Sequence, residues 1–180
     1  SKNYSKTVEE VIPIQMTLGG VQKVLQNLLR EGVSIRDLLT IVETLADYAP
    51  LTKDTDVLTE YVRQRLGRSI VKNYLVEGNK LPVVTFTSQV EELLSRSLKT
   101  TEAGTYLAID PSMADKLVES IKNGIQKLTM MGYTPILLTS PIVRLHVKRL
   151  TEREIPDLVV LSSSEIPPEV KIQSFATIGV

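Results

Sequence analysis

The chain has 180 residues, of which 42% are hydrophobic and 4% aromatic, so it is long enough to bury one large aliphatic core or two small ones. Its 21 basic and 21 acidic residues, divided 11 to 10 in residues 1–80 and 10 to 11 in residues 81–180, disfavour nucleic acid as the main partner, because polyanion-binding proteins carry a basic excess. The absence of cysteine excludes disulfides, thiolate metal sites and thiol catalysis.

The sequence shows neither a membrane span nor a secretion signal. No run approaches the ~18 consecutive apolar residues that a membrane-spanning helix needs, and the N-terminus lacks the charged and apolar regions of a signal peptide. The sequence begins at Ser1 without an initiator methionine, so we expect it to be part of a longer protein.

Residues 17–31 predict the first amphipathic helix. Its apolar residues recur at three- and four-residue spacing, which places them on one face: Leu18, Val21, Val24, Leu25, Leu28 and Leu29. Gly32 follows directly and predicts a left-handed C-cap that ends this helix.

A second helix is predicted from Ser34 to Pro50. Ser34 and Asp37 have the spacing of a capping box, in which the hydroxyl accepts from the third helical amide and the carboxylate accepts from the N–H of the cap residue. Such a cap contributes ~1 kcal/mol, so we expect Ser34→Ala to lower stability by that amount. The residues predicted to face inward are Ile35, Leu38, Leu39, Val42, Leu45 and Ala46.

A third helix is predicted over residues 54–74. Acidic residues lie at its start and Arg63, Arg65 and Arg68 follow, an order that the helix dipole favours by ~0.3–1 kcal/mol per residue. The arginines also suit a protein–protein interface, where a planar guanidinium bridges carboxylates. Both interpretations stay open. Residues 17–80 together predict a compact all-helical subdomain, which ends in the linker-like stretch EGNKLP.

From residue 81 the pattern changes to short runs rich in β-branched residues, separated by helical patterns. The predicted strands are 81–86, 105–109, 134–138, 157–161 and 170–178, and the helices between the first four are 89–98, 111–131 and 141–151. Asp110 and Ser140, each followed by proline, predict helix N-caps, and Gly132 predicts a C-cap.

Alternating strands and helices predict an α/β subdomain over residues 81–180, with at least partly parallel pairing. We expect a small mixed sheet of about four to five strands. The predicted fold class is therefore α+β or α/β, with the all-helical subdomain preceding the α/β subdomain.

The sequence contains no recognisable catalytic, cofactor-binding or metal-binding constellation. His146 is the only histidine, and one histidine without cysteine does not form a typical zinc site. A dinucleotide-binding glycine fingerprint, a P-loop and a nucleophile elbow are all missing. We therefore predict that the chain is not an enzyme and has no cofactor.

A basic helix offers a different kind of site. Arg144, His146, Lys148 and Arg149 lie within two turns and form either a solvated helix face or a patch that docks a partner. The turn at Ser140, just before this helix, has the free amides that favour an anion. A soluble nucleotide- or nucleic-acid-binding regulatory module is therefore the alternative function.

Met130 and Met131 lie at the end of the predicted helix over residues 111–131. We interpret them as core residues, since methionine is apolar and fills irregular gaps. A role in a docking surface is the alternative interpretation.

Five segments carry a resemblance to a known family. They are VLQNLLREGVSIRDLLTIVETLADYA (24–49), DVLTEYVRQRLGRSIVKNYL (56–75), LPVVTFTSQVEELLSRSL (81–98), LAIDPSMADKLVESI (107–121) and PDLVVLSSSEIPPEVKIQSFATIG (156–179). In this order they resemble the flagellar branch of the inner-membrane export-gate family of type III secretion systems. The resemblance runs from about Val8 to Val180, and residues 24–47 are its most specific part.

The resemblance implies a part of a larger bacterial inner-membrane protein, with this fragment on the cytoplasmic side. The fragment then holds the last two of four cytoplasmic subdomains: a helical one (17–80) and an α/β one (81–180), preceded by the tail of another (1–16). The family's cytoplasmic domains form a nonameric ring that receives export substrates, their chaperones and components of the export ATPase complex.

The same resemblance implies where subunits of the ring meet. In the family the helical subdomain contacts its neighbours, so its charged residues become candidates for the subunit interface: Arg30, Arg36, Asp37, Arg63, Arg65 and Arg68. No catalytic residue of the family lies in this part of the protein, and the membrane is reached only through a region that these 180 residues do not include.

Overall fold

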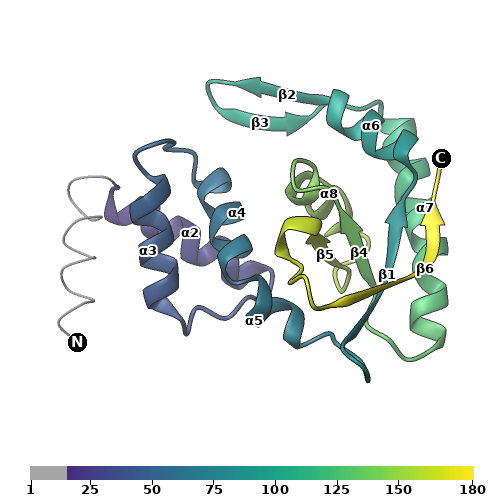
Figure 1. The fold of residues 1–180 in the computed structure, drawn as a ribbon. Helices are drawn as coiled ribbons and strands as arrows, with labels where there is room; N and C mark the ends of the chain where they lie inside the picture. Colours follow the sequence, from purple (N-terminus) through teal and green to yellow (C-terminus); the bar gives the residue numbers. More distant parts are fainter. Residues whose placement is uncertain (1–15) are drawn as a thin grey trace. The chain divides into compact units, whose positions relative to one another are not determined.

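The computed structural model describes residues 16–180, whose contacts separate the chain into two compact units (Figure 1). We call residues 16–72 the helical unit and residues 73–180 the α/β unit. The predicted fold class, a helical part followed by a small α/β part, is confirmed. The predicted tail at residues 1–16 lies outside the described residues except for Met16.

The division between the units falls before the linker predicted at residues 77–82. The segment that leads into the first strand forms a tight turn, in which Val76 and Lys80 pair as an isolated antiparallel bridge. Asn79 in this turn donates from its side-chain amide to the Glu169 carbonyl at 2.8 Å. These contacts tie the segment to the sheet.

The helical unit packs three helices around an aliphatic core and adds a short fourth one. They are α2 (Leu18–Arg30), α3 (Leu38–Tyr48), α4 (Thr55–Arg65) and α5 (Gly67–Lys72). Helix α4 packs against both α2 and α3. Its buried Leu58 and Val62 therefore belong to the same unit as Leu28 of α2 and Ile41 of α3. Gly32, at φ 72°, ends α2 as predicted.

The predicted capping box of the second helix is wrong, because α3 begins at Leu38 and Asp37 is its N-cap. The Asp37 carboxylate accepts from the Thr40 N–H at 3.2 Å and from the Thr40 hydroxyl at 2.7 Å. Ser34 accepts only from the Arg36 N–H, at 3.2 Å, in the loop before the helix. Satisfying two donors with one carboxylate favours the later start.

The inward face of α3 also differs from the prediction. Ile41 and Leu45 are fully buried, whereas Leu38, predicted to face inward, is 43% exposed. The prediction of Leu45 is confirmed and that of Leu38 is wrong. Packing against α4 decides which side of α3 is buried.

The single helix predicted over residues 54–74 is also wrong, since it divides into α4 and α5. Leu66 ends α4 with φ −89° and ψ 6°, and the buried Gly67 begins α5. Glycine inside a helix costs about 1 kcal/mol relative to alanine, so this position is a natural break.

The α/β unit contains a four-stranded sheet in the order β5-β4-β1-β6. Its strands are β1 (Lys80–Phe86), β4 (Ile136–Thr139), β5 (Val159–Ser162) and β6 (Lys171–Ile178), and every neighbouring pair is parallel. Between Val83 and Val84 the β1–β6 register shifts, which leaves Phe175 without a partner in the ladder.

Three helices and one short turn connect these strands. They are α6 (Ser88–Arg96), α7 (Pro111–Met130), α8 (Arg144–Thr151) and the 3₁₀ turn η1 (Ser163–Glu165). Side chains of α6, α7 and α8 form one buried cluster with alternate residues of the sheet, such as Val84, Leu137 and Val160. Two predicted caps of α7 are confirmed, Asp110 at its start and Gly132 just after its end.

Helix α7 lies very close to the edge strand β6. A Cβ at Gly124 would come within 2.7 Å of Ile178 Cγ1, so only glycine fits at this crossing. The strand β6 is thus held from one side by β1 and over its end by α7.

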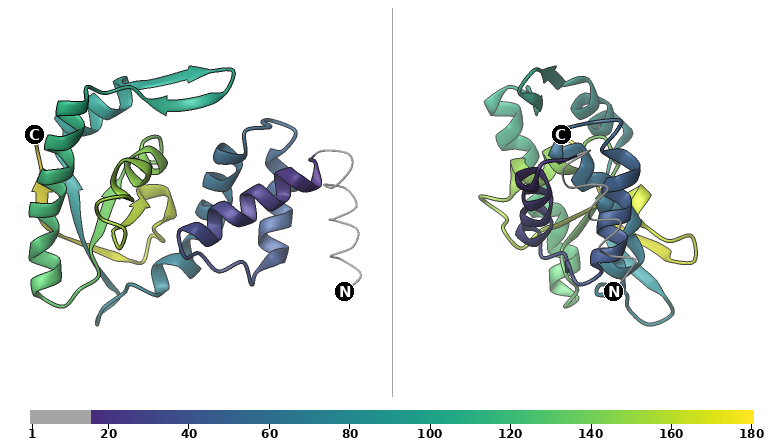
Figure 2. Two further views of the ribbon diagram at one scale, coloured as in Figure 1. Left: turned by 180° about the vertical axis from the view of Figure 1, so that it is seen from behind. Right: turned by 90° about the vertical axis from the view of Figure 1, so that its left-hand side faces the viewer.

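The strand predicted at residues 105–109 does not join the sheet. Strands β2 (Leu98–Thr101) and β3 (Gly104–Leu107) instead pair antiparallel as a separate hairpin, which extends away from α6 (Figures 1 and 2). Gly104, at φ 121°, permits its tight turn. Within residues 16–180, antiparallel pairing is therefore confined to this hairpin and to the isolated Val76–Lys80 bridge.

No helix within residues 16–180 is both long and apolar enough to cross a membrane. The longest helix, α7, is amphipathic and has exposed charged residues along its length, such as Lys116 and Lys127.

The capping geometry gives a prediction that separates Asp37 from Ser34. We expect Asp37→Ala to lower the free energy of unfolding by about 1 kcal/mol, because two donors of the first turn of α3 lose their acceptor. Ser34→Ala, the matched control, should change it by less than about 0.5 kcal/mol. Urea unfolding followed by circular dichroism measures both. A larger loss of stability from Ser34→Ala than from Asp37→Ala would contradict Asp37 as the N-cap and support the predicted capping box.

Candidate functional site

Arg63, one of the predicted interface arginines, is a buried residue. Its side chain is 3% exposed, and its Nη1 lies 3.8 Å from Glu31 Oε1, with the Glu31 side chain 11% exposed. A buried guanidinium next to a carboxylate costs several kcal/mol to leave unpaired. Arg63 is therefore part of the interior of the protein.

Arg65 lies in an exposed cluster with aromatic side chains. Its Nη2 is 3.1 Å from Asp47 Oδ2, and its guanidinium carbon is 5.7 Å from the centre of the Tyr48 ring. Tyr48 in turn stacks on Tyr61, with ring centroids 3.9 Å apart. Hydrogen bonding to Tyr48 and then to Asp47 raises the pKa of Arg65 above its ordinary value. The cation is thus fixed on the surface of α4.

The other interface candidates lie on the surface of the helical unit. Arg30 is in the last turn of α2, Arg36 precedes α3, and Arg68 is in the first turn of α5, and all three are exposed. Asp37 is also exposed, but its carboxylate caps α3. The sequence therefore placed residues of two kinds, surface and interior, in one group.

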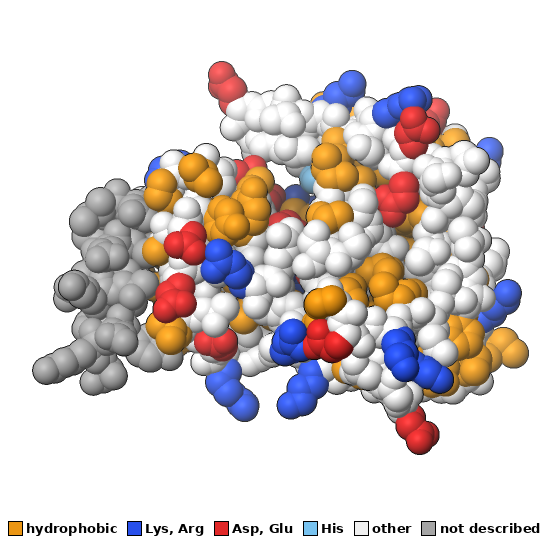
Figure 3. Space-filling view, in the orientation of Figure 1, with side chains coloured by type: hydrophobic (Ala, Val, Ile, Leu, Met, Phe, Trp, Pro, Cys, Tyr) orange, Lys and Arg blue, Asp and Glu red, His pale blue; other side chains and the backbone are white. Residues whose placement is uncertain are grey.

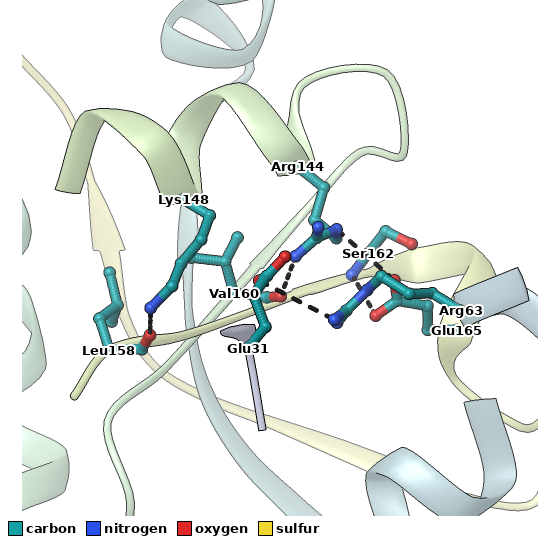
Figure 4. Close-up of polar contacts among 8 residues, drawn as sticks. All are labelled: Glu31, Arg63, Arg144, Lys148, Leu158, Val160, Ser162 and Glu165. Carbon is teal, nitrogen blue, oxygen red and sulfur yellow. Dashed lines mark hydrogen bonds and ion pairs between the residues drawn. The ribbon is translucent and has the colours of Figure 1, made fainter. Parts of the chain in front are cut away.

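Arg144, a predicted docking residue, is completely buried in the α/β unit. Its Nη1 donates to the Val160 carbonyl at 3.0 Å, and its Nε lies 3.7 Å from Glu165 Oε2 (Figure 4). The other carboxylate oxygen of Glu165 accepts from the Ser162 N–H at 3.4 Å. The two side chains join α8 to the end of β5 and to η1.

The rest of the basic helix is only partly accessible. Lys148 donates from Nζ to the Leu158 carbonyl at 2.6 Å, which also ties α8 to β5 (Figure 4). His146 is half-buried, and Arg149 is exposed. The predicted solvated face is therefore restricted to Arg149 and part of His146.

The anion-favouring turn at Ser140 already holds a carboxylate of the protein itself. Glu91, from α6, accepts from the Ser140 N–H at 3.1 Å and from its hydroxyl at 2.9 Å. Ser140 does not cap α8, whose N-cap is Val143 without a side-chain hydrogen bond. The predicted N-cap is thus wrong, and the position proposed for a nucleotide phosphate is filled.

Within residues 16–180 no three side chains of His, Cys, Asp or Glu gather in a way that would hold a metal ion. The polar contacts of this part of the chain instead link one helix, strand or turn to another.

The sequence interpretation of Met130 and Met131 as core residues is wrong. Met130 is 86% exposed and Met131 is 55% exposed. Hydrophobic side chains lie at the surface over the C-terminal end of α7 (Figure 3, lower right). The helical period does not predict their exposure, because both residues lie at the C-terminal end of α7, beyond Leu128, its last buried residue.

Apolar side chains are exposed on the helical unit as well. Leu18 and Leu29 of α2 are 67% and 54% exposed, and Leu51, after α3, is 78% exposed. Leu18 and Leu29 are eleven residues apart, which places them on the same side of an α-helix. The amphipathic pattern of α2 therefore includes a second apolar stripe besides its buried one.

Comparison with known proteins identifies similar sequences. Residues 1–171 match the model of the FHIPEP family. The chain is 44% identical to the flagellar biosynthesis protein FlhA of Bacillus subtilis over 179 residues, 99% of this chain and 26% of that protein. It is 34% identical to the low calcium response locus protein D of Yersinia pestis, covering 96% of this chain and 24% of that protein. The chain thus spans about a quarter of these relatives.

Solved structures are similar over the whole chain. The Chlamydia pneumoniae CdsV protein has a TM-score of 0.91 at 35% identity, with 99% of this chain and 51% of that chain covered. A nonameric SctV-C from EPEC has a TM-score of 0.87 at 33% identity, with 98% and 53% covered. A structure of CdsV in complex with CdsO has a TM-score of 0.88 at 36% identity, with 99% and 52% covered.

The buried pair in the α/β unit gives a second prediction. We expect Glu165→Ala to lower the free energy of unfolding by about 3–5 kcal/mol, because Arg144 then keeps its charge in the interior without this carboxylate. Replacing both residues together, Arg144→Met with Glu165→Leu, should cost less than Glu165→Ala alone.

Chemical unfolding of the three proteins measures these differences. The control is Asp157→Ala, an exposed carboxylate in the loop before β5, which should change stability by less than about 0.5 kcal/mol. A Glu165→Ala protein as stable as the control would show that Arg144 does not depend on this carboxylate.

Proposed function

The chain belongs to the FHIPEP family, and we propose that it is the cytoplasmic part of a flagellar type III protein export gate. In this role it is a ring-forming docking platform for export substrates, their chaperones and components of the export ATPase complex. The parent protein is anchored in the bacterial inner membrane through segments outside these 180 residues, and the two units described here lie on the cytoplasmic side.

One observation carries the proposal. The chain matches SctV-C, which is nonameric, over 98% of its length with a TM-score of 0.87. A second relative, the EscV cytosolic domain of a type III secretion system, is also nonameric, and matches at a TM-score of 0.84 and 34% identity. This likeness in backbone to two nonameric proteins supports ring assembly by this chain.

The flagellar assignment rests on sequence identity. The chain is 44% identical to a flagellar relative and 34% identical to the low calcium response locus protein D. The EscV cytosolic domain of a type III secretion system also matches this chain in backbone, so the fold alone does not make the flagellar assignment.

The surface of the helical unit supplies the proposed subunit contact. We assign Arg30, Arg36 and Arg68 to it, because these guanidinium groups are exposed and suited to carboxylates of a neighbouring subunit. Arg63 and Asp37 support this surface indirectly. Arg63 pairs with Glu31, which follows α2, and Asp37 caps α3. The exposed Leu18 and Leu29 add the apolar area that a contact of this kind buries.

Docking of export factors is proposed for the α/β unit. The relative CdsV has been solved in complex with CdsO, which supports a binding role for this region of the family. Arg149, which is exposed, and His146, which is half-buried, are the residues of the basic helix that we assign to such a contact. The buried Arg144 and the tied Lys148 position α8 instead.

Ring formation gives a third prediction. We expect the double variant Arg36→Glu and Arg68→Glu to self-associate at least about tenfold more weakly than the parent protein. Its melting temperature should stay within about 2 °C of that of the parent protein. Both residues are exposed and lie at helix N-termini, where the helix dipole favours a negative charge, so we expect the melting temperature to change little.

Sedimentation velocity over a concentration series measures this association. In a second format the chain is tethered through an N-terminal tag to lipid vesicles, which raises its local concentration, and is then cross-linked. Lys116→Glu, an exposed charge reversal in the first half of α7, is the control. Unchanged association of the double variant, or equal loss in the control, would contradict the assignment.

A further inference from the structure

The outer edge of β5 is occupied by groups of the protein itself. β5 is an outermost strand of the sheet: β4 pairs with one of its sides, and no strand in the described part of the chain pairs with the other. The Val159 N–H donates toward β4, to the Pro135 carbonyl, at 3.0 Å. Because backbone groups of successive strand residues alternate in direction, those of Leu158, Val160 and Ser162 point away from β4.

Two cations of α8 occupy outward carbonyls of this edge. Lys148 donates from Nζ to the Leu158 carbonyl at 2.6 Å (Figure 4). Arg144 donates from Nη1 to the Val160 carbonyl at 3.0 Å. The spacings match, since residues four apart on a helix are separated by about 6 Å along its axis and residues two apart on a strand by about 6.6 Å. One face of α8 therefore serves two successive outward carbonyls of β5.

Outward N–H groups of the same edge have partners as well. The Leu158 N–H donates to the Ile155 carbonyl at 3.1 Å. The Ser162 N–H donates to Oε1 of Glu165 in η1 at 3.4 Å. Backbone groups that are bonded within the chain are not available to a further strand, and natural sheets protect their edges with a covering helix or with charges.

The cations of α8 do more than attach this helix to the sheet. Val143 and Val147 already lie in the buried cluster that α8 shares with the strands. Arg144 is completely buried and Lys148 is half-buried, so both cations lose hydration. Apolar residues of similar volume in place of a buried ion pair are often neutral or stabilising. What apolar residues do not supply is a hydrogen-bond donor for an outward carbonyl of β5.

We propose that Arg144 and Lys148 of α8, together with Glu165 of η1, close the β5 edge and prevent a second copy of this chain from adding a strand to it. A second copy is the partner that this closure excludes, because two identical edges are self-complementary about a two-fold axis. An open edge presents a row of unpaired N–H and C=O groups, which is a template for such pairing. The proposal concerns the α/β unit alone and does not depend on ring formation.

Lys148→Met tests this closure, because methionine is unbranched and apolar and donates no hydrogen bond. We expect its dissociation constant for self-association, measured by sedimentation equilibrium, to be at least about tenfold lower than that of the parent chain. Lys148→Arg keeps a donor and should behave as the parent chain does. None of these substitutions changes the helical unit, so any association through that unit is common to all the proteins compared.

Arg149→Met is the matched control, since it removes the same charge from an exposed position of the same helix. It should associate as the parent chain does. If Lys148→Met associates no more strongly than Arg149→Met, or if both associate more strongly than the parent chain by the same factor, the proposal is overturned.

The double variant Arg144→Met with Glu165→Leu removes the second donor of the edge and its carboxylate partner. We expect it to self-associate more strongly than the parent chain, as Lys148→Met does, because the Val160 carbonyl loses the Arg144 donor. Association of the double variant equal to that of the parent chain would contradict a role of Arg144 in closing the edge.

Amide hydrogen exchange of Lys148→Met separates pairing through β5 from loss of the fold. Pairing should slow exchange of the outward Val160 amide as the protein concentration rises, while the amides that face β4 keep their protection. Partial unfolding has the opposite signature, since it speeds exchange throughout β4 and β5 at every concentration. Association accompanied by faster exchange of both strands would therefore count against closure of the edge by Lys148.

Discussion

The α/β unit depends on the central position of β1. This strand is the first of the sheet in the chain, yet it pairs with β4 on one side and with β6, the last strand, on the other. Its residues Leu81, Val83 and Val84 are fully buried, so β1 has no stable place until both neighbours are present. The buried pair that joins α8 to η1 and the contact of α7 with β6 both rest on this arrangement.

Local features of the fold could be predicted wherever one residue type decides the outcome. Gly32 and Gly132 end helices because their left-handed backbone suits glycine, and Asp110 starts one next to a proline. Ser34 and Asp37 are both suitable N-caps for α3, and the sequence alone does not show which side-chain oxygen accepts from the first turn of that helix. The hairpin at residues 98–107 was missed because its strands are short and pair only with each other.

The candidate site was harder to predict, because exposure of a charged residue depends on distant partners. Arg63 and Arg65 are two residues apart, but Arg63 is buried beside Glu31, whereas Arg65 is exposed beside Asp47. Arg144 is buried by Glu165, which lies on a different element. Charge spacing along a helix identifies surface arginines on average. It carries no information about which ones meet a buried carboxylate from elsewhere in the chain.

The order of the strands also fixes when the α/β unit is completed during synthesis. Lys171 pairs beside Lys80, about 90 residues earlier in the chain. At the usual rates of translation of about 5–20 residues per second, β1 waits several seconds for its outer neighbour. During that time the helical unit is already whole, while one buried edge of the sheet is uncovered. The strand β6, the last of this sheet to be synthesised, therefore closes the unit, and a chain that stops short of β6 exposes β1 to any other strand nearby.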